Sequence, residues 1–201
     1  MILEGLVTTT NLDGTPHLAP MGPALNEGST ELVLRPFRTS TTFANLERTG
    51  VGVFHVTDDV EMLARTAVGG LETLPPLERA TAVEGWILTG ACRWLAFRVR
   101  TADLSSERAS FVADVIERGT LREFFGFNRA KHAVVEAAIL ATRVHLLPKA
   151  ELVEQLTRLE PWVAKTGGPQ ERRAFDFLAD YIEQAAPQLG EPGVSTPEAH
   201  H

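Results

Sequence analysis

The chain has 201 residues, of which 44% are hydrophobic and 22% are charged, and its formal net charge is −7. This length and composition predict a soluble, folded protein with one sizeable domain or a domain with an appended subdomain. The negative charge argues against nonspecific binding to nucleic acid or to an anionic membrane, because both favour a basic surface. We therefore expect neither as a partner.

The cysteine content and the N-terminal sequence indicate a cytoplasmic protein. Cys92 is the single cysteine, so it has no internal disulfide partner, and no Cys/His cluster has the spacing of a zinc site. Residues 1–5 lack a basic region followed by an apolar core, and no apolar run approaches the roughly 18 residues that a membrane span needs. We expect no metal site.

The first 35 residues predict an antiparallel meander of three strands. Residues 2–10 are apolar and β-branched, residues 11–14 have turn chemistry, and residues 16–25 resume an extended pattern. After a second turn, residues 31–35 form the third predicted strand.

The stretch 35–45 has the composition of an anion site at the start of a helix. Pro36 ends the third strand, and Arg38 with four hydroxyl residues at 39–42 precedes a short helix at 43–48 that Gly50 caps. The first N–H groups of a helix lack internal partners and lie at the positive end of its dipole, so a phosphate suits them. Ordinary capping by the Ser/Thr cluster is the alternative at this point.

The middle of the chain predicts further strands around one short helix. Residues 51–56 form an apolar strand, Asp58 caps a helix that Gly69-Gly70 ends, and residues 71–85 form a loop. Residues 92–100 alternate as a strand does. The periodicity of residues 110–116 fits a helix as well as a strand.

The last third predicts helices at 128–146, 151–165 and 169–186, because each segment combines helix-forming residues with helical periodicity. Strands therefore come first and helices last, which is typical of the α+β class. We expect a strand-rich domain at 1–126, a helical subdomain at 127–187 and a loose tail at 188–201.

A polar stripe on the first of these helices is a candidate site. Arg129, His132, Glu136 and Arg143 share one face, and the rest of the helix is apolar. Two interpretations are open: a solvated face, or a face turned toward a pocket or an internal ion-pair network. His55, on an apolar strand, is more typical of a core or pocket-edge histidine than of a catalytic base.

Several blocks along the chain resemble a known family. They are residues 8–11 (TTTN) with 13–14 (DG), 19–22 (APMG), 35–42 (RPFRTSTT) with 45–46 (NL), 126–132 (GFNRAKH), 135–137 (VEA) and 141–143 (ATR). In this order they resemble a family of flavin split-barrel proteins, the domain of unknown function family 447. That family is similar to pyridoxamine-phosphate oxidases and flavin reductases.

The resemblance implies a six-stranded antiparallel Greek-key split barrel, a homodimer, and FMN in a groove between the two copies. It also implies that residues 110–116 form a strand, and that the FMN phosphate lies where the third strand meets the next helix. A lysine that often follows the hydroxyl there is absent, so Arg38 or Arg35 must supply the cation. The implied cofactor residues are Thr9, Pro20, Met21, Gly22, Arg35, Arg38, Thr39, Ser40, Thr41, Thr42, Asn45, Asn128 and Arg129.

The function that the resemblance implies is an FMN-dependent oxidoreductase acting on a small anionic substrate. Lys131 and His132, with Arg129, would orient that substrate, and Arg143 would brace Glu136. The alternatives are a non-catalytic flavin carrier or sensor, and a structural dimeric barrel without flavin.

Overall fold

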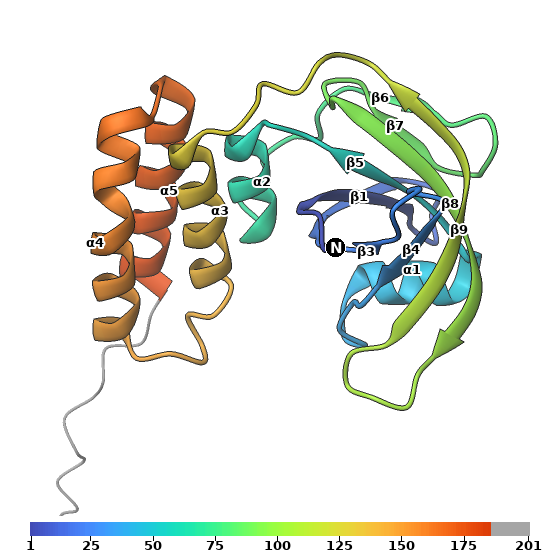
Figure 1. Cartoon of the computed structure of the whole chain (residues 1–201). Coiled ribbons are helices and arrows are strands. Elements are labelled where there is room, and N and C mark those ends of the chain that lie inside the picture. The colour runs from blue at the N-terminus through green and yellow to red at the C-terminus, as the bar shows by residue number, and fades with distance from the viewer. Residues whose placement is uncertain (186–201) are drawn as a thin grey trace, which may run out of the picture.

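The computed structural model describes residues 1–185, a strand-rich body beside a set of helices (Figure 1). The predicted tail at 188–201 and the final residue of the predicted helix 169–186 lie outside these residues. A curled sheet forms one side of the molecule, and the helices α3 (Arg129–Ala141), α4 (Lys149–Thr166) and α5 (Pro169–Ala185) form the other. The predicted α+β class, with strands first and helices last, is confirmed.

The main sheet contains seven strands, all paired antiparallel, in the order β2-β1-β5-β8-β9-β4-β3. The strands are β1 (Gly5–Thr10), β2 (Pro16–Met21), β3 (Ala24–Leu25), β4 (Glu31–Leu34), β5 (Val51–Val56), β8 (Arg93–Asp103) and β9 (Ser110–Thr120). The predicted number of six is wrong. Gly22 and Pro23 divide the predicted strand 16–25, since proline lacks the N–H that a sheet ladder needs. The two halves lie at opposite edges of the sheet.

Of two further segments, residues 71–85 differ from the predicted loop, whereas residues 110–116 form the strand that the resemblance implied. The predicted loop 71–85 contains β6 (Leu77–Arg79), which pairs with β7 (Trp86–Leu88) in a small second sheet. The hydroxyls of Thr8 and Thr10 donate to the carbonyls of Trp86 and Glu84, which ties this sheet to β1. Residues 110–116 lie in β9, so the strand implied by the resemblance is confirmed over the helical alternative.

The two short helices begin at side-chain caps. In α1 (Thr41–Thr49), the Ser40 hydroxyl accepts the N–H of Phe43 at 3.2 Å, and Gly50 ends the helix with a left-handed φ of 65°. In α2 (Val60–Ala67), the cap is Asp59 and not the predicted Asp58. The carboxylate of Asp58 instead pairs with Arg122.

The helix α3 ends at Ala141, earlier than the predicted end at Leu146. The N–H of Arg143 donates to the carbonyl of Leu140 at 2.9 Å, and the N–H of Leu146 donates to that of Arg143 at 2.8 Å. These three-residue turns replace the helical i−4 bonds, although the apolar composition favours continuation.

Apolar side chains gather into a barrel core and a helical core. The barrel core contains Phe54, Phe97 and Phe111 between the sheet and α1. The helical core unites α3, α4 and α5 with Leu63 and its neighbours on α2, a helix that lies within the N-terminal part of the sequence. The division of the chain at residue 126 stays a prediction. No helix among residues 1–185 is long and apolar enough to cross a membrane.

His55 lies fully buried on β5, with both ring nitrogens bonded. Nε2 accepts the N–H of Leu88 at 3.0 Å, and Nδ1 lies 3.3 Å from the carbonyl of Leu6. These partners fit a neutral ring that carries its proton on Nδ1. The interpretation as a satisfied core histidine is confirmed. Burial lowers the pKa of His55 from 6.5 to about 4.

This buried histidine predicts an acid-sensitive fold. The unfolded chain binds a proton at His55 below pH 6.5 and the folded chain only near pH 4. Stability from this group is therefore complete above pH 6.5 and falls by about 3 kcal/mol as the pH drops to the folded pKa. In urea unfolding, the free energy of unfolding of His55→Gln should not show this decrease between pH 6.5 and pH 4. The exposed control His145→Gln should show the same decrease as the unchanged protein. Equal pH profiles for all three proteins would contradict the assignment.

Candidate functional site

A cleft separates the end of the barrel from the helices. It consists of two adjoining cavities of about 370 and 130 Å³, which share Glu4, Leu63 and Val135. Its walls come from the segment before β1, the ends of β2 and β5, α2, the linker before α3, and α3 itself. The chain thus brings together segments far apart in sequence, and we call this space the barrel–helix cleft.

Two groups of predicted site residues meet in the barrel–helix cleft. Residues 20–22, predicted to contact the flavin ring, line the smaller cavity, and the predicted substrate residues Lys131 and His132 line the larger one. β2 is an edge strand, so one side of its backbone has no strand partner among the described residues. An unpaired strand edge can offer backbone N–H and C=O groups to a ligand.

Asp58 fastens the linker to the barrel at the cleft wall. Its carboxylate accepts two guanidinium N–H groups of Arg122 and the backbone N–H of Phe125, the last at 2.8 Å. The bonds from Arg122 and Phe125 outweigh the effect of burial and lower the pKa of Asp58 to about 2. Asp58 is therefore a structural anion that fixes the course of residues 122–125.

Lys131 is committed to a buried ion pair. Its Nζ donates to Glu171 at 2.7 Å, to the carbonyl of Asp58 at 2.7 Å and to Gln170 at 3.1 Å. An ammonium has three N–H donors, so none is left for a substrate. The side chains of Lys131 and Glu171 are only 12% and 9% exposed. The prediction that Lys131 orients a substrate therefore finds no free donor in this structure.

The polar stripe on α3 forms no basic surface around the cleft. Arg129, His132, Glu136 and Arg143 are all exposed, and no ion pair joins Arg143 to Glu136 among the residues that the structure describes. The predicted bracing of Glu136 by Arg143 is wrong. Only His132 and Glu136 of this stripe line the cleft.

The ionisable groups left free in the cleft are Glu4, Glu136 and His132. Partial burial raises the pKa of Glu4, and the neighbouring charge of Glu136 raises it further. Because Asp58 and Lys131 are neutralised by their partners, the two glutamates dominate the charge of the cleft. Within residues 1–185 no group of three or more His, Cys, Asp or Glu side chains is arranged to hold a metal ion.

Three phenylalanines of the linker form an aromatic rim. Phe124 and Phe127 line the cleft, and the ring centre of Phe125 lies 5.5 Å from Lys131 Nζ. The rings of Phe127 and His132 are nearly perpendicular, with their centres 6.2 Å apart. Phe127 is 96% exposed, which is unusual for so large an apolar side chain. This rim was not predicted from the sequence. A cluster of three aromatic residues within four positions of a linker was the available signal.

The N-terminus of α1 presents free hydrogen-bond donors and cations. The exposed hydroxyls of Thr39 and Thr41 have no partner among residues 1–185, and the first turn of α1 contains no acidic residue. Arg38 donates one N–H to the carbonyl of Leu104 at 2.9 Å and lies over Phe43, and Arg35 is exposed. Ser40 is used as the helix cap, and Thr42 is buried.

Thr9 and Asn45 bond to each other behind this helix start. The amide of Asn45 donates to the Thr9 hydroxyl and to the side chain of Asn11, both at 3.0 Å. Arg48 donates to the carbonyl of Thr10. These bonds attach α1 to the end of β1, so Thr9 and Asn45 fix the position of α1 against the sheet.

Asn128 and Arg129 lie outside the lining of the cleft. Asn128 caps α3 by accepting the N–H of Lys131 at 3.1 Å, and its amide donates to the carbonyl of Thr166. Arg129 is exposed on the first turn of α3. Residues 35–45 also do not line the cleft. The predicted residues therefore fall into separate places: the α1 start, the cleft, and the cap of α3.

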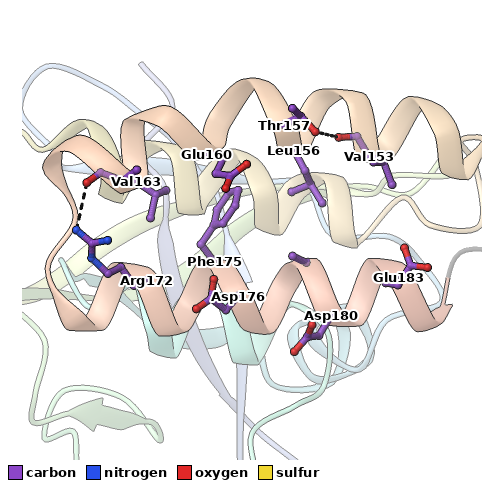
Figure 2. Close-up of a pocket in the computed structure, with 12 residues that line it drawn as sticks. Val153, Leu156, Thr157, Glu160, Val163, Arg172, Phe175, Asp176, Asp180 and Glu183 are labelled. Atoms are coloured by element: carbon purple, nitrogen blue, oxygen red, sulfur yellow. Dashed lines mark hydrogen bonds between the residues drawn. The ribbon is translucent and has the colours of Figure 1, made fainter.

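A groove of about 500 Å³ lies between α4 and α5 (Figure 2). Glu160, Asp176, Asp180 and Glu183 line it, and Arg172 donates across it to the carbonyl of Ala164 at 3.1 Å. It contains none of the predicted site residues and no histidine, so the barrel–helix cleft and the α1 start form the candidate site.

The chain matches a family in two blocks. Residues 3–122 match the N-terminal domain of the DUF447 family of proteins of unknown function, and residues 128–180 match a second DUF447 domain. No curated protein is detectably similar to the chain.

Solved structures share the fold. An FMN-bound DUF447 protein from Methanosarcina mazei is 24% identical, with 90% of this chain and 94% of that chain covered and a TM-score of 0.74. A flavin reductase domain protein from Arthrobacter is 19% identical, with 61% and 80% covered and a TM-score of 0.53. A flavoredoxin from Methanosarcina acetivorans is 16% identical, with 59% and 68% covered and a TM-score of 0.51.

Proposed function

Because the chain belongs to the DUF447 family, we propose that it is a flavoprotein that binds FMN and acts as an oxidoreductase on a small molecule. The observation that carries the proposal is the likeness, over 90% of the chain, to a protein of the same family that holds FMN. The two flavin-related folds among the other neighbours support it. The single cysteine, which is buried, supports a reducing, cytoplasmic location.

The start of α1 is the proposed seat of the FMN phosphate. Arg38, the hydroxyls of Thr39 and Thr41, and the N–H groups of the first helical turn are donors that suit a dianion. Arg35 adds a second cation nearby in the sequence, and no carboxylate in the first turn opposes binding. Ser40 and Thr42 shape this helix start, while Thr9 and Asn45 hold it against β1.

The edge of β2 is the proposed seat of the ring. Residues 20–22 offer backbone groups beside an apolar wall, and a Cβ on Gly22 would lie 3.0 Å from the carboxylate of Glu4. Once bound, FMN would supply the electron-transfer chemistry. The side chains of this chain would bind and orient the partners, Phe124 and Phe127 would exclude water, and His132 would offer a hydrogen-bonding group in the cleft.

The charges in the cleft do not favour the small anionic substrate that the resemblance implied. A small anionic substrate requires free cations, whereas Lys131 is used by Glu171 and the free carboxylates are those of Glu4 and Glu136. The cleft therefore suits a neutral or cationic substrate better.

We propose a homodimer as the working assembly. The exposed aromatic rim supports this, because a large apolar side chain such as Phe127 gains free energy when a second copy covers it. A dimer also offers a way for residues at the α1 start and in the cleft, which share no cavity within one copy, to serve one ligand.

Flavin spectroscopy tests the proposal. Purified protein should show a flavin absorbance spectrum, or acquire it with added FMN, and should release FMN on denaturation. Reduction of the flavin by NADH or NADPH, as well as by dithionite, would support an oxidoreductase. Reduction by dithionite alone would favour the carrier or sensor. Colourless protein without affinity for FMN would overturn the proposal and leave the structural barrel.

A further inference from the structure

A separate cavity of about 290 Å³ opens at the end of the barrel, and two arginines line it. Arg93 lies at the start of β8, and Arg118 lies near the end of β9. The cavity shares Leu3 and Val56 with the barrel–helix cleft, but it contains none of the residues predicted to bind flavin or substrate. We call it the barrel-mouth cavity.

The strand register directs the two arginines to one place. Arg93 is paired with Thr120, and Leu95 is paired with Arg118. Residues paired across two strands share a face, as do residues two apart on one strand, so Arg93 and Arg118 are diagonal neighbours on the same face. Diagonal neighbours lie about 7 to 8 Å apart, which lets two long guanidinium side chains reach one small anion.

No carboxylate balances this pair of cations. None lines the cavity, and neither arginine forms an ion pair with any residue in the described range 1–185. Arg118 donates one N–H to the carbonyl of Gly28 at 3.2 Å. In a chain of net charge −7, two neighbouring guanidinium groups without a counter-ion form a local positive site that an organic anion would neutralise.

The floor of the cavity is apolar. Leu25 and Leu95 belong to the barrel core, and the partly buried Leu3 packs against the same core. Ser29 and Thr120 add hydroxyls to the lining. A volume of about 290 Å³ equals that of roughly ten water molecules, and this corresponds to a ligand of about ten non-hydrogen atoms.

We propose that the barrel-mouth cavity binds a small carboxylate with an apolar body, the carboxylate held by Arg93 and Arg118 and the body against Leu3, Leu25 and Leu95. This site does not depend on flavin binding. The small anionic substrate that the resemblance implied would then bind beside the barrel–helix cleft, in which the free charged groups are acidic.

Octanoate, which has the required size and charge, is the probe for this proposal. Trp94 lines the cavity, so its fluorescence should change saturably as octanoate is added to the full chain. Octanol and octylammonium, which lack the negative charge, and inorganic phosphate, which lacks the apolar body, should each bind at least about tenfold more weakly. An equal response to octanol or phosphate, or no saturable response to octanoate, would overturn the proposal.

Substitutions locate the binding. Arg93→Gln with Arg118→Gln should weaken octanoate binding by about tenfold or more, since charged hydrogen bonds are lost. Thr120→Glu, which keeps both arginines and changes only an exposed side chain, should weaken it similarly by placing a carboxylate at the cavity. Arg98→Gln, an exposed arginine on the same strand outside the cavity, should bind as the unchanged protein does.

FMN titration of the same variants separates this site from the proposed flavin site. The arginine variant should retain the FMN affinity of the unchanged protein. A parallel loss of FMN affinity would assign the arginines to the flavin and overturn the proposal of a separate carboxylate site. Unchanged octanoate affinity in both the arginine variant and Thr120→Glu would overturn it too.

Discussion

Replacing Lys131 by methionine is expected to destabilise the protein by roughly 3 kcal/mol, because it leaves Glu171 buried without its cation. The single substitution also removes the bond from Nζ to the carbonyl of Asp58, which joins α3 to the end of the barrel. Urea unfolding measures the loss. Arg129→Met, on the same helical turn but exposed, should change stability by less than about 0.5 kcal/mol.

The pH dependence of this variant separates a structural role from substrate binding. In the folded protein, burial raises the pKa of Glu171, but the bonds from Lys131 and the N–H of Gly168 outweigh it and lower the pKa below 4.5. The pair therefore stabilises the fold above that pH and loses this effect as Glu171 is protonated. Without Lys131, burial favours the neutral acid, so the cost of the substitution should shrink at low pH.

A double substitution completes this test. Lys131→Met with Glu171→Gln should be less destabilised at neutral pH than Lys131→Met alone, since no unpaired charge remains. Lys131→Met protein that keeps its full stability at neutral pH, yet loses turnover of a substrate, would contradict the structural assignment. It would return Lys131 to the substrate role that the sequence suggested.

Local chemistry made much of the fold predictable. Ser40, Gly50 and Asn128 cap helices where the sequence indicated helix ends, because each cap acts within one turn of chain. The division of the predicted strand 16–25 depends on which sheet edge each half joins. The strand β6 depends on its partner β7, which the hydroxyl of Thr8 ties to β1. Such long-range pairing leaves little trace in a local pattern.

The candidate site was predictable only in part, because charge in a protein depends on partners distant in sequence. The resemblance implied that Lys131 and His132 would orient an anionic substrate. Lys131 is neutralised by Glu171, which lies 40 positions away in the sequence. Asp58 is neutralised by Arg122, which lies 64 positions away. The arginines at the barrel mouth meet only through the register of β8 and β9.

Replacing Arg38 and Ser40 together by alanine is expected to weaken FMN binding by about a hundredfold. A charged hydrogen bond to phosphate contributes about 1.5 to 3 kcal/mol, and loss of a helix cap costs about 1 kcal/mol. Ser40 already accepts the N–H of Phe43 and donates to the carbonyl of Phe37 at 2.7 Å. Ser40 should therefore contribute to FMN binding indirectly, by holding the start of α1 in place.

Riboflavin, which lacks the phosphate, supplies the decisive comparison for this variant. If the phosphate lies at the start of α1, quenching of flavin fluorescence should show weaker binding of FMN and little change for riboflavin. Thr41→Val, which removes a free hydroxyl but keeps the side-chain shape, should weaken FMN binding to a smaller degree. The exposed control Arg98→Ala should bind both flavins as before. Equal losses for FMN and riboflavin would mean that the substitutions disturb the ring end, and unchanged FMN affinity would place the phosphate elsewhere.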